Sequence, residues 1–289
     1  MSNPQVRPVI FHVDVNSAFL SWEAVYRLRH LGGTVDLREE LCAVGGDRQS
    51  RRGIILAKSQ SAKKFGVRTG ESILEARKKC PGLKLVPANY QLYRKSSEAF
   101  IRLLREYSPE VEQYSIDEAF VNMTGMEQLF GPPRQAAEAI RERIYRELGF
   151  TVNIGVSSNK LLAKMASDFK KPNLVHTLFP EEIEEKMWPL PVRELFFVGG
   201  ATERSLKRLG IHTIGDLART DPELLRSHLK KHGEVIWNFA NGRDAGVVEA
   251  EEPDNKNYGN STTIPFDVTD AGTARMVPVS YTHLTLPTT

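Results

Sequence analysis

Two neighbouring carboxylates interrupt an apolar stretch of the sequence. Asp117 and Glu118 lie in "YSIDEAF" (114–120), between Ile116 and Ala119. Burying two adjacent like charges is costly, so the pair needs compensation if the stretch is buried. The local pattern leaves three possibilities open: a turn in water, a salt bridge or a metal ion.

The predicted elements around this pair form a recognisable order. Residues 8–16 predict a buried strand, 110–125 predict two strands with a tight turn between them, and 150–157 alternate as a half-buried strand does. Amphipathic helices are predicted over 90–107 and 132–148. Strand, helix, strand, strand, helix, strand is the split βαβ, ferredoxin-like order, here interrupted after the first strand by roughly seventy residues.

This order bears on a third carboxylate, Asp14, at the end of the first strand. In the split βαβ pattern the first strand and the two middle strands can be neighbours, which would bring Asp14 close to Asp117 and Glu118. Three carboxylates at one place favour divalent cations with oxygen ligands. Two Mg²⁺ ions about 4 Å apart can activate a hydroxyl and stabilise a leaving oxygen in phosphoryl transfer. From spacing alone, a solvated hairpin turn explains Asp117 and Glu118 equally well.

Composition sets the broad class of protein. The chain has 289 residues, 40% of them apolar, and a net charge of 39 − 36 = +3, which is weak evidence for nucleic acid by itself. Cys42 and Cys80 lack the spacing of a zinc site, so reduced thiols are expected. No apolar run approaches the length of about 18 residues that a membrane helix needs, and the N-terminus lacks a signal-peptide pattern. We expect a cytoplasmic protein.

The second half of the chain is predicted to be mainly helical over 179–246, followed by a polar, acidic segment typical of a linker. The last residues, "VSYTHLTLPTT" (279–289), have no periodicity and resemble a translated sequencing adapter. We therefore leave 276–289 out of the fold prediction and expect the natural protein to be longer.

Three segments together carry a family resemblance: "VIFHVDVNSAF", "YSIDEAF" and "NIGVSSNKLLAKMASDFKKPN". In this order and spacing they resemble the palm motifs of the Y-family, or lesion-bypass, DNA polymerases, most closely the polymerase IV-like and UmuC-like bacterial group. The resemblance covers residues 8 to about 270. It implies an α+β right hand with a ferredoxin-like palm, small fingers, a helix-hairpin-helix thumb and a truncated little finger. The implied domains are a palm (1–17 and 89–178), fingers (18–88), a thumb (179–246), a linker (247–258) and the start of a little finger (259–275).

The resemblance also implies a reaction and its cofactors. Asp14, Asp117, Glu118 and the backbone carbonyl of Val15 would bind two Mg²⁺ ions. One ion would lower the pKa of the primer 3′-hydroxyl, and the other would hold the β- and γ-phosphates of the incoming dNTP. Asp117 would contact both ions, and Glu118 would chiefly support the ion at the hydroxyl.

Several further residues match positions that contact the nucleotide in the family. Phe19 stands at the steric gate that excludes ribonucleotides, although a core Phe on the helix beginning here explains it as well. Lys171 matches a lysine that reaches the triphosphate, whereas Lys164 is expected on the solvated face of the same helix. Gln60 and Lys63 stand where the family often has Tyr and Arg, so that stacking and the bidentate fork are lost. The full set of expected nucleotide contacts is Val15, Asn16, Ser17, Ala18, Phe19, Gln60, Lys63 and Lys171.

"LFFVGGATERSLKRLGIHTIGDLA" (195–218) resembles a helix-hairpin-helix. Backbone N–H groups at the start of a helix can face a DNA phosphate, which positions DNA without reading its sequence. The expected DNA contacts are Gly199, Gly200, Lys207, Arg208 and Gly210, with the two adjacent glycines allowing a tight turn.

The resemblance implies a monomeric, error-prone translesion DNA polymerase that acts on primer-template DNA and dNTPs. In the full-length protein a sliding clamp would be a further partner, and no membrane is involved. Two rivals stay open: a nucleotidyl cyclase, which also uses a ferredoxin-like palm with metal-binding carboxylates, and a non-catalytic DNA-binding fragment. A cyclase would not need the helix-hairpin-helix.

Overall fold

The computed structural model describes residues 7–46, 53–251, 257–258, 267–272 and 284–285. Its contacts group the chain into two compact units, Met1–Arg38 with Asn89–Ala250 and Glu39–Ala88 with Glu251–Thr289. Unit 1 carries the predicted carboxylates.

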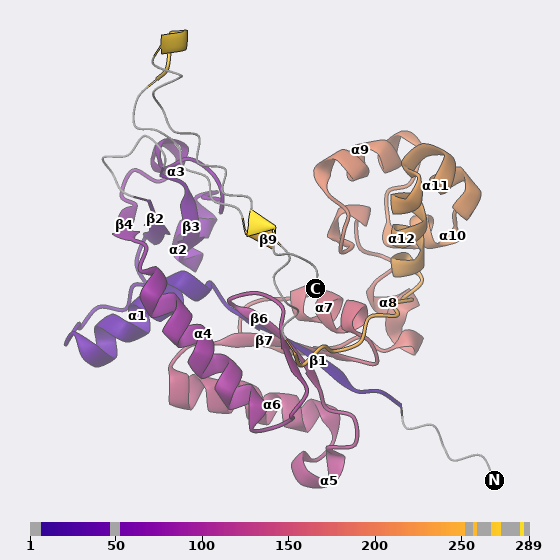
Figure 1. Cartoon of the computed structure of the whole chain (residues 1–289), viewed down its shortest axis with the longest axis horizontal. Coiled ribbons are helices and arrows are strands. Elements are labelled where there is room, and N and C mark those ends of the chain that lie inside the picture. The colour runs from indigo at the N-terminus through magenta and orange to yellow at the C-terminus, as the bar shows by residue number, and fades with distance from the viewer. Residues whose placement is uncertain (1–6, 47–52, 252–256, 259–266, 273–283, 286–289) are drawn as a thin grey trace. The chain divides into compact units, whose positions relative to one another are not determined.

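Unit 1 is built on a five-stranded sheet in the order β5-β6-β1-β7-β8. Figure 1 labels three of these strands, β1, β6 and β7. The strands are β1 (Ile10–Val15), β5 (Val111–Gln113), β6 (Glu118–Asn122), β7 (Val152–Ser157) and β8 (Val175–Thr177). Neighbouring strands are antiparallel except for β7 and β8, which are parallel. The first four reproduce the ferredoxin-like order, so the predicted α+β fold is confirmed, while β8 is an edge strand that the sequence pattern did not predict.

In the described part of the chain, five helices accompany this sheet, and the longer ones bury an apolar face. They are α1 (Ala18–His30), α4 (Tyr90–Arg105), α5 (Glu127–Phe130), α6 (Pro133–Leu148) and α7 (Lys160–Asp168). Figure 1 shows α4 and α6 side by side, in agreement with their contacts. Helix α6 begins at a proline and ends at Gly149, whose φ of 82° suits a residue without a Cβ. Helix α7 packs directly on β7 and β1.

A helical region follows the sheet within unit 1, as the sequence predicted. It contains α8 (Ile183–Lys186), α9 (Gly200–Arg208), α10 (Ile214–Arg219), α11 (Pro222–Leu229) and α12 (Lys231–Ala240), with 3-10 turns at Pro180–Glu182 and Val192–Glu194. Its core, which includes Leu206, Leu217 and Ile236, continues into the buried residues Leu161 and Met165 of α7. This region is therefore anchored on the helix that lies against the sheet.

Unit 2 contains a three-stranded sheet in the order β3-β2-β4, formed by β2 (Cys42–Gly45), β3 (Ile55–Lys58) and β4 (Lys84–Pro87). Helices α2 (Gln60–Lys64) and α3 (Ile73–Lys79) accompany it. Strand β9 (Asn257–Tyr258) pairs with β10 (Leu284–Thr285). Most of the predicted little-finger segment (259–275) and tail (276–289) lies outside the described residues.

In the part of the chain that the structure describes, no helix has the length and apolar character needed to cross a membrane.

Candidate active site

Strand pairing brings the three predicted carboxylates to one end of β1. Asp14 lies directly opposite Glu118 in the antiparallel β1–β6 pair. The next residue, Val15, donates its backbone N–H to the carbonyl oxygen of Asp117 at 3.0 Å. Since opposite residues of an antiparallel pair have Cα atoms about 4.5–5.5 Å apart, the backbone alone places these carboxylates in one neighbourhood.

Two lysines lie on the carboxylates. Lys171 Nζ donates to Asp14 Oδ1 at 2.8 Å and also contacts Asp168 at 2.8 Å. Lys164 Nζ donates to Glu118 Oε2 at 2.6 Å. With the side chains in these positions, no three Asp, Glu, His or Cys residues among those described form a group that could hold a metal ion. The negative charge is instead partly neutralised by the lysines.

This neutralisation is incomplete for two of the three carboxylates. Burial raises the pKa of Asp14 to about 6; Lys171 opposes the rise, whereas the charges of Glu118 and Asp168 add to it. Burial also raises the pKa of Asp117, against a hydrogen bond from the hydroxyl of Ser115 at 2.8 Å. Both carboxylates would be stabilised by further positive charge.

Glu118 has a different environment. Burial by itself would raise its pKa, but contacts with His12 and Lys164 outweigh burial and lower the pKa below its ordinary value. His12 is fully buried, with Nε2 at 3.4 Å from Glu118 Oε2 and Nδ1 at 2.8 Å from the hydroxyl of Ser167. Burial lowers the pKa of His12, so the neutral imidazole is favoured.

The chemical types of these side chains suit a divalent cation. Carboxylate and carbonyl oxygens are the ligands of hard cations such as Mg²⁺, and a cation would offset the burial that raises the pKa of Asp14 and Asp117. A cation would take the place of the Lys171 contact on Asp14, while Lys164 and His12 stay on Glu118. That exchange needs side-chain rotations only, because the β1–β6 pairing already fixes the backbone.

Two residues at this site were not found from the sequence. The expectation that Lys164 lies on a solvated face was wrong, because its exposed fraction is 9% and it reaches Glu118. Helical spacing carried a signal, since Lys160, Lys164 and Ser167 follow i, i+4, i+7 and form one face of α7. His12 carried a second signal. It lies two residues before Asp14 on β1, so both side chains point to the same face of the strand.

Phe19 is the second residue of α1 and is half-buried. Its ring stacks on that of Tyr93 from α4, with centroids 4.5 Å apart and an interplanar angle of 10°. The chain turns into α1 through Ser17, whose φ of 48° is left-handed. Phe19 therefore has a fixed partner, although its role at a nucleotide stays a prediction.

The other predicted nucleotide contacts fall into two groups. The side chains of Val15 and Ala18 are buried, so only their backbone can reach a ligand. The amide of Asn16 donates to Asn153 at 3.2 Å and accepts from the backbone N–H of Asn173 at 2.9 Å, which gives it a structural role.

Gln60 and Lys63 lie on α2 of unit 2, where both side chains are exposed. The structure brings Asp14, Asp117, Glu118 and Lys171 together within unit 1, whereas Gln60 and Lys63 belong to unit 2. Their contact with a triphosphate stays a prediction.

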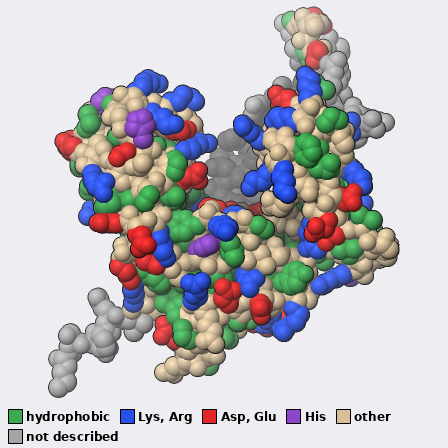
Figure 2. Space-filling view, turned by 180° about the vertical axis from the view of Figure 1, so that it is seen from behind, with side chains coloured by type: hydrophobic (Ala, Val, Ile, Leu, Met, Phe, Trp, Pro, Cys, Tyr) green, Lys and Arg blue, Asp and Glu red, His purple; other side chains and the backbone are tan. Residues whose placement is uncertain are grey.

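The predicted DNA contacts surround helix α9. Gly199 precedes its first residue Gly200, and Gly210 follows it with a φ of 79°. Arg208 is in the last turn, beside Lys207, which pairs with Glu203 at 2.8 Å. Figure 2 shows several Lys and Arg side chains on the displayed face of the molecule.

The left-handed residue in the turn before α9 is Phe197, with a φ of 73°, and its exposed fraction is 56%. Gly199 itself is extended, with a φ of −82°. The tight turn therefore does not depend on a left-handed conformation at the adjacent glycines.

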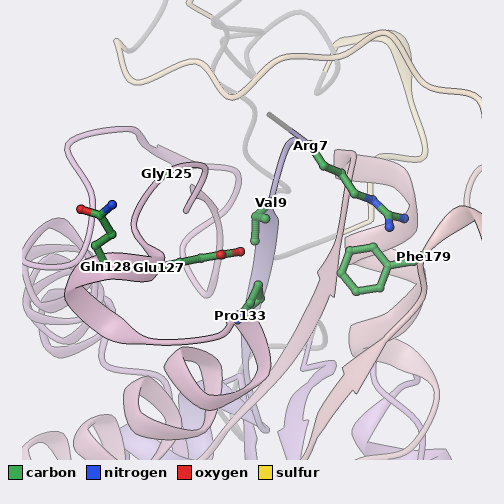
Figure 3. Close-up of a pocket in the computed structure, with 7 residues that line it drawn as sticks. All are labelled: Arg7, Val9, Gly125, Glu127, Gln128, Pro133 and Phe179. Carbon is green, nitrogen blue, oxygen red and sulfur yellow. The ribbon is translucent and has the colours of Figure 1, made fainter. Parts of the chain in front are cut away.

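A pocket of about 420 Å³ lies at the other end of β1 (Figure 3). Arg7 and Phe179 lie on one side of it, and the Arg7 guanidinium stacks 4.5 Å above the ring and pairs with Glu181. Val9, which also lines it, is five residues from Asp14, or roughly 16 Å along an extended strand. This pocket is separate from the carboxylates.

Comparisons with known proteins agree with the site geometry. Residues 13–168 match the impB/mucB/samB family, and residues 180–211 match the helix-hairpin-helix motif of the same family. The first match spans β1 to α7 and includes all three carboxylates. The second covers the turn that leads into α9.

Individual relatives point the same way. The chain is 49% identical to DNA polymerase IV of Clostridium acetobutylicum over 266 residues, covering 91% of this chain and 66% of the relative. It is 41% identical to DNA polymerase IV of Acetivibrio thermocellus, covering 94% and 67%. The crystal structure of DinB from Sulfolobus solfataricus superposes with a TM-score of 0.73 at 26% identity, covering 84% of this chain and 69% of that one. The chain thus spans about two thirds of the length of these relatives, and it belongs to the impB/mucB/samB family, the Y-family of DNA polymerases.

Proposed function

We propose that this chain carries the catalytic parts of a template-directed, error-prone translesion DNA polymerase. The observation that supports this most directly is the β1–β6 pairing, which sets Asp14 opposite Glu118 and beside Asp117. The relatives named DNA polymerase IV support the same activity. A cyclase would not require the helix-hairpin-helix motif at 180–211, and a DNA-binding fragment would not require the carboxylates.

We infer that Asp14, Asp117, Glu118 and the Val15 carbonyl hold two Mg²⁺ ions. When bound, the ions supply Lewis-acid activation of the primer 3′-hydroxyl and charge neutralisation on the triphosphate. Lys171, which now neutralises Asp14, is suited to move to the triphosphate once cations occupy the carboxylates. Lys164 and His12 keep Glu118 ionised and hold it in place.

We further propose that Phe19 blocks the 2′-hydroxyl of ribonucleotides and that the region around α9 holds the duplex through Gly199, Gly200 and nearby basic side chains. Residues 1–17 and 89–178 would form the palm, 18–88 the fingers and 179–246 the thumb. The protein would act as a cytoplasmic monomer on primer-template DNA, with a sliding clamp as a partner of the full-length protein.

Primer extension tests the proposal. Asp14→Ala and Glu118→Ala should each abolish extension of a labelled primer, while the affinity for primer-template DNA measured by fluorescence anisotropy stays within about twofold. Glu142→Ala, which removes an exposed carboxylate on α6, is the matched control and should extend normally. Full activity in either site variant would refute the metal assignment. A cyclic product from a nucleotide without DNA would favour the cyclase.

A further inference from the structure

The aromatic partner of Phe19 is itself held by a hydrogen bond. Tyr93 is completely buried, and its ring lies flat against Phe19 at 4.5 Å. Its hydroxyl donates to Glu23 Oε1 at 3.2 Å. Burial raises the pKa of Tyr93, so the hydroxyl keeps its proton at neutral pH and can serve as the donor.

Glu23 is an unusual residue for its position. It lies on α1, four residues after Phe19, and its side chain is only 6% exposed. A buried carboxylate is costly unless hydrogen bonds or opposite charges compensate it. Its polar contacts in unit 1 are the Tyr93 hydroxyl and the guanidinium of Arg27, whose Nε lies at 3.6 Å.

These residues form a continuous path along α1 that begins at the predicted gate. Phe19, Glu23 and Arg27 follow i, i+4, i+8 and therefore share one face of α1. Tyr93 bridges the path from α4, with its ring on Phe19 and its hydroxyl on Glu23. Helix α1 thus fixes the ring of Tyr93 at two points, and this ring limits how far Phe19 can retreat.

We propose that Glu23 is a positioning residue for sugar selection. Its carboxylate anchors the Tyr93 hydroxyl, which fixes the plane on which Phe19 stacks and keeps Phe19 close to the sugar of the incoming nucleotide. Without the anchor, Tyr93 can tilt, Phe19 gains room to move back, and a 2′-hydroxyl is accommodated. The inference rests on the proposed polymerase function and on Phe19 as the gate.

The test compares deoxynucleotides and ribonucleotides opposite the same template base. The variants are Glu23→Ala, Glu23→Gln and Tyr93→Phe, and the measured quantity is the ratio of the two kcat/KM values. Glu23→Ala and Tyr93→Phe should each lower sugar discrimination roughly tenfold, the size of effect expected from loss of one charge-assisted hydrogen bond. The change should come mainly from a lower KM for the ribonucleotide. Glu23→Gln should keep most of the discrimination, because an amide oxygen can still accept from Tyr93.

Two measurements separate positioning from a general structural role. Equilibrium binding of the two nucleotides on a dideoxy-terminated primer gives the discrimination without the chemical step. Glu98→Ala removes an exposed glutamate on α4, the helix of Tyr93. It should change neither the ratio of the two kcat/KM values nor the ratio of the two binding affinities. A merely structural Glu23 would affect both nucleotides equally.

The outcomes are distinct. Unchanged discrimination in Tyr93→Phe, or an equal loss for both nucleotides in Glu23→Ala, would overturn the positioning role while leaving the polymerase assignment intact. If Glu23→Ala does not fold, Tyr93→Phe decides, because it keeps the ring stack and removes only the hydroxyl. A wild-type chain that binds primer-template DNA but neither binds nor incorporates nucleotides would overturn the proposed function and this inference with it.

Discussion

Glycine at position 155 allows helix α7 to lie directly on the central part of the sheet. A Cβ at this position would lie 1.9 Å from the carbonyl oxygen of Ala163 and 2.5 Å from the backbone nitrogen of Ser167. Both contacts are with backbone atoms of α7, which no rotamer change can relieve. Ordinary contact begins at 3.4 Å, so in Gly155→Ala the helix must retreat by about 3.4 − 1.9 = 1.5 Å.

The expected cost follows from what α7 buries. All seven residues from Leu161 to Ser167 are buried. A gap of about 0.5–1 Å between packed atoms already removes a quarter to a half of their dispersion energy. We expect Gly155→Ala to lower the free energy of unfolding by about 3–5 kcal/mol. For a domain of this size the midpoint of thermal unfolding should fall by roughly 10 °C. Extension should also be lost, because Lys164 moves away from Glu118 with the helix.

Tryptophan fluorescence suits this measurement, because Trp22, Trp188 and Trp237 all lie in unit 1. Gly125→Ala is the control, since Gly125 has a φ of 79° but nothing within 4 Å of the position that a Cβ would take. It should cost only the left-handed strain of about 1–2 kcal/mol. A Gly155→Ala protein that unfolds within about 0.5 kcal/mol of wild type, far below the usual cost of overpacking, would refute the close-packing argument.

Three further predictions concern other parts of the chain. Phe197→Gly should leave the free energy of unfolding unchanged or raise it by up to about 1 kcal/mol, because relief of the left-handed strain at Phe197 offsets the greater conformational entropy that glycine loses on folding. A decrease of more than about 1 kcal/mol, measured by denaturant unfolding, would contradict this. Hydrogen bonds from the backbone N–H groups of Thr213 and His212 lower the pKa of Asp216 in the folded protein. The stabilisation that Asp216 contributes to the fold is therefore complete above its unfolded-state pKa of about 4, and it is lost as the pH falls through its lower folded-state pKa. Asp216→Asn should therefore lower the unfolding midpoint more at pH 7 than at acid pH, where the effect shrinks as Asp216 takes up its proton, and an equal effect at neutral and acid pH would contradict the assignment. Lys171→Gln should raise the KM for dNTP roughly tenfold with a smaller change in kcat, as steady-state extension kinetics can show, and an unchanged KM would remove Lys171 from triphosphate binding.

The sequence was most informative where a pattern is local and long. Helix α6 was predictable because apolar spacing, an early proline and a terminal glycine agree, and α4 was predictable from its apolar spacing. The sheet order followed from the sequence of elements, which is why the proximity of Asp14 to Glu118 could be anticipated across a hundred residues. Strands β4 and β8 were missed because three or four residues show too little alternation to be distinguished from loop.

Side-chain environments were harder to predict, because they depend on partners far along the chain. Lys164 was misassigned to solvent because lysine on an amphipathic helix is usually exposed, and its partner Glu118 comes from another element. The contact between Tyr93 and Glu23 joins two helices whose sequences give no sign of each other. Contacts of this kind emerge only when the folded chain brings distant segments together.

The central place of β1 in the sheet has a consequence for the growing chain on the ribosome. Asp14 pairs with Glu118 on one side and with Asn153 on the other, which are 104 and 139 residues later in synthesis. At about 5–20 residues per second, β1 waits roughly 5–20 s for its first partner and several seconds more for its second. During that interval both of its hydrogen-bonding edges and the apolar side chains of Phe11 and Val13 stay unpaired, which favours contact with other chains. Nascent-chain folding of unit 1 should therefore begin only after β7 has left the exit tunnel, and chaperones that shield extended apolar segments should raise the yield of folded protein.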